Sequence, residues 1–284
     1  MNNVILIATN GYEGTWPAIE YGAWVAQAIG AEVRLLGVTE GAGSAESAAK
    51  LDGLLQRATA LLSEKGLRHT SERRGGRCED IITGTARAVD GITVLGPLGR
   101  PRLRRLIAGR SIRGLLEGIE SPVLYVPHAC LPMKRMLICL GGLGYEITAE
   151  HLAVRLAVAA GADATLLHVA PPVDLDYPTA RAEREHWRDL VNTDTLTGRN
   201  LRGAVETARA AGLSASIKAR QGSVVDEIVE EMKTGNYDLT CMGSAHGFSS
   251  LRHLYEPNVT DEVAEQAQCP LLTARYAPEV GGGV

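Results

Sequence analysis

The chain has 284 residues, of which 45% are hydrophobic and 22% charged, and its formal net charge is −4. This composition is that of an ordinary globular protein, and the length suggests two domains of about 150 residues each. No stretch approaches the roughly 18 uncharged apolar residues that span a bilayer. The amino-terminal segment lacks a signal-peptide pattern, and the five cysteines form no C-x-x-C pair. We therefore expect a cytoplasmic protein with no membrane partner.

The two halves of the chain differ in charge. Residues 1–130 hold 15 basic and 13 acidic side chains, a net charge of +2, whereas residues 131–284 hold 14 and 20, a net charge of −6. Neither half has the strongly basic character of a nucleic-acid-binding domain. An anionic small ligand is better suited to the first half.

Strand and helix patterns alternate in the same order twice along the chain. In the first half we expect strands at residues 4–9, 33–38, 67–73, 92–96 and 123–126. Between them we expect helices at residues 15–30, 51–66, 78–89 and 109–117. In the second half we expect strands at residues 135–140, 164–169, 215–219, 238–243 and 271–274, with the clearest helix around residues 201–211.

This alternation predicts two Rossmann-like α/β domains, residues 1–130 and 131–284, each a five-stranded parallel sheet with helices on both faces. The strands at 123–126 and 271–274 are candidates for pairing, either between subunits of a homodimer or within the molecule as a pseudo-dimer. The connection between the second and third strands is about 28 residues long in the first half and about 44 in the second. The extra segment begins at the strand edge where such sheets bind ligands. It is either a lid over the second site or, as we favour, simply a longer helix packed on a neighbour.

A glycine motif follows the fourth strand of each half. The first copy is Gly96-x2-Gly99-x9-Gly109, and a degenerate copy, Gly243-x3-Gly247-x9-Pro257-Asn258, begins 147 residues later. Glycine lets the backbone approach a ligand closely, and a helix start near Gly109 attracts phosphate. Six arginines between residues 100 and 113 either hold a polyphosphate or belong to a solvated loop, a subunit contact or an RNA contact.

At this point the pattern resembles the universal stress protein family, whose domain ends in a strand, Gly-x2-Gly-x9-Gly-Ser/Thr, a helix and a proline-led edge strand. The resemblance covers nearly the whole chain as two tandem domains. The resemblance implies a stress-response regulator, and not a turnover enzyme, that binds ATP or AMP with or without Mg²⁺. The implied site residues in the first half are Asn10, Val38, Gly96, Gly99, Gly109, Arg110 and Ser111.

Within that resemblance, the glycines form the phosphate cradle, and Arg110 and Ser111 donate to phosphate. Asn10 and Val38 hold the nucleoside. Asn10 stands where the family has an aspartate, and Arg110 stands where it has a hydroxyl residue. Asparagine keeps a hydrogen-bonding side chain but loses the charge.

The second half departs further, because Leu140-Gly141-Gly142 replaces the aspartate turn and Pro257 removes an N–H donor. We expect a degenerate site there, made of Gly243, Gly247, Asn258 and Thr260, that does not bind ATP.

Two other classes of function stay open. The chain is alternatively an interaction or dimerisation protein in which both sites have decayed. A hydrolase ranks last, since the sequence offers no general base and its seven histidines show no metal-ligand spacing. His168, inside an expected strand, is interpreted as a satisfied core residue.

Overall fold

The computed structural model describes residues 4–40, 45–97, 112–128, 130–142, 144, 146–170, 185–244 and 259–275. The chain divides into two compact units, Met1–Leu131 and Pro132–Val284. Within the described ranges, no helix combines the length and apolarity that crossing a membrane requires.

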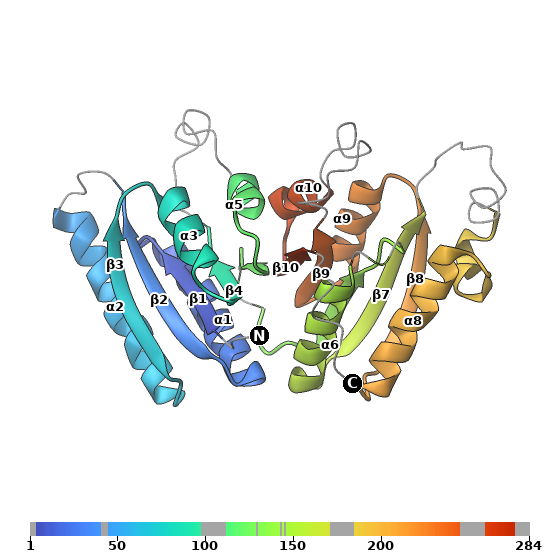
Figure 1. Ribbon diagram of the computed structural model, residues 1–284, viewed down its shortest axis with the longest axis horizontal. Helices are drawn as coiled ribbons and strands as arrows, with labels where there is room; N and C mark the ends of the chain where they lie inside the picture. The colour runs from blue at the N-terminus through green and yellow to red at the C-terminus, as the bar shows by residue number, and fades with distance from the viewer. Residues whose placement is uncertain are drawn as a thin grey trace. The chain divides into compact units, whose positions relative to one another are not determined.

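The first unit is a parallel sheet with the strand order β3-β2-β1-β4-β5 (Figure 1). Its strands are β1 (Val4–Thr9), β2 (Glu32–Thr39), β3 (His69–Gly75), β4 (Gly91–Leu95) and β5 (Val123–Tyr125). Its helices are η1 (Glu13–Thr15), α1 (Trp16–Ile29), α2 (Ala45–Glu64), α3 (Cys78–Arg87) and α5 (Ile112–Gly118). Right-handed crossovers place α1 and α2 on one face of this sheet and α3 and α5 on the other.

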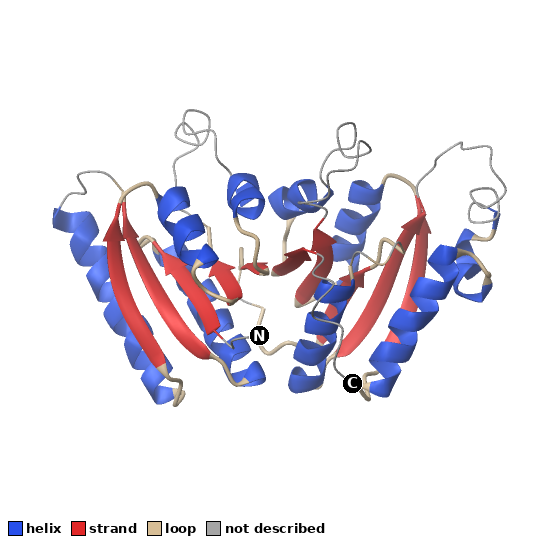
Figure 2. Cartoon of the chain, viewed as in Figure 1, coloured by secondary structure: helices blue, strands red, loops and turns tan. Residues whose placement is uncertain are grey.

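The second unit repeats this arrangement with the order β10-β9-β6-β7-β8, also parallel. Its strands are β6 (Arg135–Cys139), β7 (Asp163–Ala170), β8 (Ala215–Gln221), β9 (Leu239–Ser244) and β10 (Leu271–Arg275). Its helices are α6 (Ile147–Ala160), η2 (Trp187–Asn192), α8 (Leu196–Ala210), α9 (Val224–Gly235) and α10 (Val259–Gln266). Helices flank the strands of each unit on both faces (Figure 2), so the predicted fold class is confirmed.

Side-chain patterning explains why these segments fold as they do. All six residues of β1 are buried, as expected for a central strand of a parallel sheet covered on both faces. Helix α2 buries one stripe, made of Leu51, Leu54, Leu55, Ala58 and Leu62, at the spacing of a single helix face. Helix α1 ends at Gly30, whose φ of +70° is the left-handed conformation typical of a helix end.

Strands lie at every predicted position, with boundaries shifted by no more than two residues. The predicted start of the helix at residue 109 lies outside the described residues, which resume at Ile112. Strands β5 and β10 each stand last in the order of their unit. Pairing through them, between subunits or within the chain, stays a prediction.

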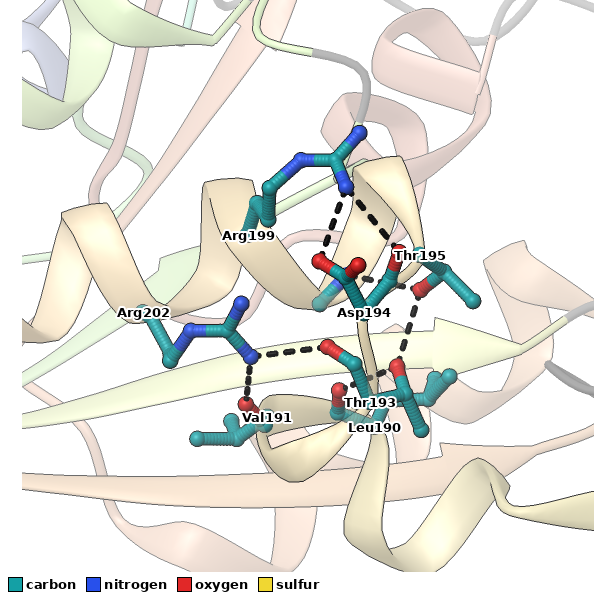
Figure 3. Close-up of polar contacts among 8 residues, drawn as sticks. Leu190, Val191, Thr193, Asp194, Thr195, Arg199 and Arg202 are labelled. Carbon is teal, nitrogen blue, oxygen red and sulfur yellow. Dashed lines mark hydrogen bonds and ion pairs between the residues drawn. The ribbon is translucent and has the colours of Figure 1, made fainter.

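The extra segment of the second unit is a packed element where it is described. Helix η2 contacts both α8 and β8, and its Leu190 is buried. Figure 3 shows the joint between η2 and α8, where the Arg202 guanidinium donates to the carbonyls of Val191 and Thr193. The described residues 185–198 are therefore packed on their neighbours as predicted, but as the short separate helix η2 followed by the start of α8, and not as one longer helix. Residues 171–184 lie outside the described ranges.

Candidate functional site

The candidate site of the first unit lies at the carboxyl end of β1. The strand ends at Thr9, and the Asn10 side-chain oxygen accepts a hydrogen bond from the Tyr12 N–H at 3.2 Å. Gly11 between them has a φ of +82°, and a Cβ there would lie 2.8 Å from the Leu51 Cα. Only glycine fits this turn, both for its conformation and for its approach to α2.

Two buried hydroxyls stabilise the same turn by hydrogen bonds. The Oγ1 atoms of Thr9 and Thr15 are 2.6 Å apart, and the Thr15 hydroxyl donates to the Tyr12 carbonyl at 2.7 Å. A hydroxyl has a single proton to donate, so Thr9 donates to Thr15 and accepts the Gly11 N–H at 3.2 Å. The buried groups that fix this turn are therefore all uncharged.

Gly96 and Val38 reach the same edge from neighbouring strands. A Cβ at Gly96 would lie 3.0 Å from the Thr15 Cα, so the first glycine of the motif lets the end of β4 pack against the start of α1. Val38 is buried and follows the last pair of β1 with β2, which joins Thr9 to Gly37. The structure thus brings Asn10, Val38 and Gly96 to one edge of the sheet.

Four other predicted residues of the first site, Gly99, Gly109, Arg110 and Ser111, lie outside the described residues. Their contribution to a phosphate cradle stays a prediction.

The second unit has the same scaffold at its own strand edge. The last pair between β6 and β9 joins Cys139 to Met242, as the last pair between β1 and β4 joins Ala8 to Leu95. Gly142, with a φ of +78°, takes the place of Gly11, and Glu146 takes the place of Thr15. A Cβ at Gly243 would lie 2.9 Å from the Glu146 Cα, which is the packing that Gly96 makes with Thr15.

The side chains around this second turn differ in charge. The Gly142 N–H donates to Glu146 Oε1 at 2.8 Å, and the Gly142 carbonyl accepts from Asn200 Nδ2 at 2.8 Å. Glu146 is buried, with 8% of its surface exposed. A carboxylate thus occupies the place that a threonine hydroxyl holds in the first unit.

A second buried acid lies one turn further along α6. Glu150 is 7% exposed and takes the place of Ile19, which is fully buried. Burial, and then the nearby Glu146 carboxylate, raise the pKa of Glu150 to about 7. A buried carboxyl in an apolar position favours its neutral form. This edge of the second unit thus holds two buried acids at the positions of Thr15 and Ile19.

Of the remaining predicted residues of the second unit, Thr260 has a structural contact. The Thr260 hydroxyl donates to the Gly243 carbonyl at 3.1 Å and is buried, so it joins the start of α10 to β9. Gly247 and Asn258 lie outside the described residues. His168 is buried, with Nδ1 hydrogen-bonded to the Leu140 carbonyl at 2.9 Å, which confirms its reading as a satisfied core residue.

No three His, Cys, Asp or Glu side chains gather to hold a metal ion in the part of the chain that the structure describes. Sequence reasoning missed Glu146, Glu150 and Asn200. A signal for the two acids was present, because aligning the copies places them opposite Thr15 and Ile19.

Comparisons with known proteins agree with this architecture. The sequence profile of the universal stress protein family matches residues 1–127 and again residues 132–275. Universal stress protein Slr1230 of Synechocystis is 21% identical over 304 residues, covering 95% of this chain and 99% of that protein.

Two solved structures show the same two-unit fold. A universal stress protein from Archaeoglobus fulgidus has a TM-score of 0.69 at 15% identity and covers 98% of each chain. A functionally unknown protein from Pseudomonas aeruginosa PAO1 has a TM-score of 0.64 at 17% identity, covering 96% of this chain and 92% of its own.

Proposed function

The chain belongs to the universal stress protein family, and we propose that its first unit binds an adenine nucleotide, ATP or AMP. In this proposal the protein is a nucleotide-responsive stress regulator and not a turnover enzyme. The observation that carries it is the difference in charge between two otherwise equivalent turns. The buried groups that hold the turn at Gly11 are uncharged, and its one acid, Glu13, is exposed and paired with Arg57, whereas the turn at Gly142 carries a buried carboxylate.

A turn whose buried groups are uncharged suits an anionic ligand, because a buried like charge would oppose phosphate at close range. In the first unit Asn10 provides an amide side chain at this edge. Val38 lies beside it, near the end of the neighbouring strand β2. The residues predicted to cradle phosphate, Gly99 and Gly109, follow Gly96 in the sequence. This half of the chain also carries the net positive charge.

Calorimetric titration with ATP and with AMP tests the proposal. We expect Asn10→Ala to weaken binding by about tenfold, the scale of one hydrogen bond of about 1.4 kcal/mol. The matched control is Gly141→Ala, at the equivalent place in the second unit. A Cβ there meets its nearest atom, Glu146 Oε2, at an ordinary 3.8 Å, so the control should leave binding unchanged.

Absence of binding by the wild-type protein at millimolar concentrations of both nucleotides would overturn the proposal. The interaction protein with two decayed sites would then be the better description. Equal losses from Asn10→Ala and Gly141→Ala would instead refute the assignment of the site to the first unit.

A further inference from the structure

In the second unit, both polar groups of Gly142 are bonded by side chains of the same unit. Its N–H donates to the Glu146 carboxylate and its carbonyl accepts from the Asn200 amide, each at 2.8 Å. Gly142 is itself buried. The turn that corresponds to the candidate site of the first unit is therefore closed by internal contacts.

Asn200 lies on α8, whose first turns are joined to η2. Figure 3 shows this joint. Thr195 caps α8 by accepting the Gly198 N–H at 3.0 Å, and Arg202 donates to the Thr193 carbonyl at 2.7 Å. A Cβ at Gly198 would lie 2.5 Å from the Leu190 carbonyl oxygen, so only glycine permits this joint. The joint between η2 and α8 thus positions the helix that carries Asn200, whose amide donates to the Gly142 carbonyl.

Glu146 immediately precedes α6, where the positive end of the helix dipole stabilises a negative charge. An external phosphate would be attracted to the same place by the same field and by free amide donors. Here the carboxylate already provides the charge and takes the Gly142 N–H. Thr15 in the first unit provides no charge at the equivalent place.

We propose that Glu146 is a built-in anion that excludes phosphate-bearing ligands from the second unit. It is a specificity-determining residue, and it makes the two units unequal in the ligands that they accept. The inference rests on the proposed function only for the contrast with the first unit, because exclusion from the second unit is measurable by itself.

The test follows the backbone amide resonances of Gly11 and Gly142 by NMR at pH 6, during titration with ATP and with inorganic tripolyphosphate. In the wild-type protein, Gly142 should not respond to either. In Glu146→Thr, which introduces the residue of the first unit, Gly142 should show a saturable shift. The apparent affinity of the variant's second unit for tripolyphosphate should rise at least about tenfold relative to the wild-type protein, which is the scale of removing one like-charge contact.

Glu150→Gln is the matched control, because it alters the neighbouring acid on α6 without touching the bond to Gly142. At pH 6 Glu150 is mostly protonated, since its pKa is raised to about 7 by burial and by Glu146. The control should therefore behave as the wild-type protein does. If Glu146→Thr loses the dispersed spectrum of a folded protein, Glu146→Gln, which keeps the shape and removes the charge, takes its place.

A wild-type Gly142 resonance that shifts with tripolyphosphate would overturn the inference. So would a folded variant at Glu146 whose Gly142 resonance stays unmoved. Failure of the proposed function is recognised separately, as a Gly11 resonance that does not respond to ATP in any of the proteins.

Discussion

Replacing Glu150 by glutamine should stabilise the second unit at neutral and higher pH. The Glu150 carboxyl is 7% exposed, and within the described residues it has no hydrogen-bond or ion-pair partner. Burial and the Glu146 carboxylate raise its pKa from 4.5 to about 7. Ionising the carboxyl in the folded protein therefore costs roughly 3 kcal/mol relative to the unfolded chain, at about 1.4 kcal/mol per pKa unit.

The sign follows from proton linkage. Between pH 4.5 and about 7 the folded state binds more protons at Glu150 than the unfolded state does. The free energy of unfolding therefore falls as pH rises through this window. Above the window, the contribution of Glu150 to the free energy of unfolding no longer changes with pH. Glutamine does not titrate, so the advantage of Glu150→Gln should be near zero at pH 4.5 and reach roughly 3 kcal/mol at pH 8.

Urea unfolding at several pH values measures this difference, with hydrogen exchange of the α6 amides reporting on the second unit alone. Glu230→Gln is a suitable control, since Glu230 is an exposed acid of α9 in the same unit. It removes an acid of the same unit and leaves the buried pair Glu146 and Glu150 unchanged. Parallel stability curves for the wild-type protein and Glu150→Gln from pH 4.5 to 8 would refute the reasoning.

Two further predictions concern packing and charge at other places. Glu231 is buried and bonded to three side chains: Lys218 at 2.6 Å, Arg220 at 2.8 Å and Tyr237 at 2.7 Å. Burial opposes ionisation, but the hydrogen bonds from Lys218, Tyr237 and Arg220 outweigh it and lower the pKa of Glu231. The stability that the ionised Glu231 contributes is therefore lost as pH falls below 4.5. At pH 7, Glu231→Ala should lower the free energy of unfolding by about 3 kcal/mol in urea unfolding. A loss under about 0.5 kcal/mol would contradict this expectation. Gly96→Ala should destabilise the first unit by about 1–3 kcal/mol in the same assay, because its Cβ would press on the Thr15 backbone at 3.0 Å; an unchanged midpoint would show that α1 shifts freely.

Much of the fold was predictable because the spacing of apolar residues indicates its most regular helices and strands. The single buried stripe of α2 is that of a helix with one buried face, and the short apolar run of β1, with its β-branched residues, favours a buried strand. Strands β3 and β8 are mostly exposed and carry little pattern of their own. They were predicted because the order of elements repeats in the two halves.

The role of the first motif glycine was less accessible to sequence reasoning. Its spacing predicted close approach to phosphate, but in both units the space at this glycine is filled by the start of a helix, at Thr15 or at Glu146. This packing explains why Gly96 and Gly243 are both present although the rest of the second motif has changed. Spacing along a chain does not reveal which backbone another element approaches, so the two causes of a glycine look alike in sequence.

Three buried acids of the second unit stand at positions where the first unit has uncharged residues. Glu146, Glu150 and Glu231 stand in the places of Thr15, Ile19 and Thr85, as strand register and helix starts show. Of the three, Glu231 is neutralised by cations and stabilises its unit, whereas Glu150 costs stability at neutral pH. A buried acid that costs stability is characteristic of functional positions. Since Glu150 lies one turn from Glu146, the cost falls beside the turn that the proposed built-in anion closes, and not in the remainder of the core.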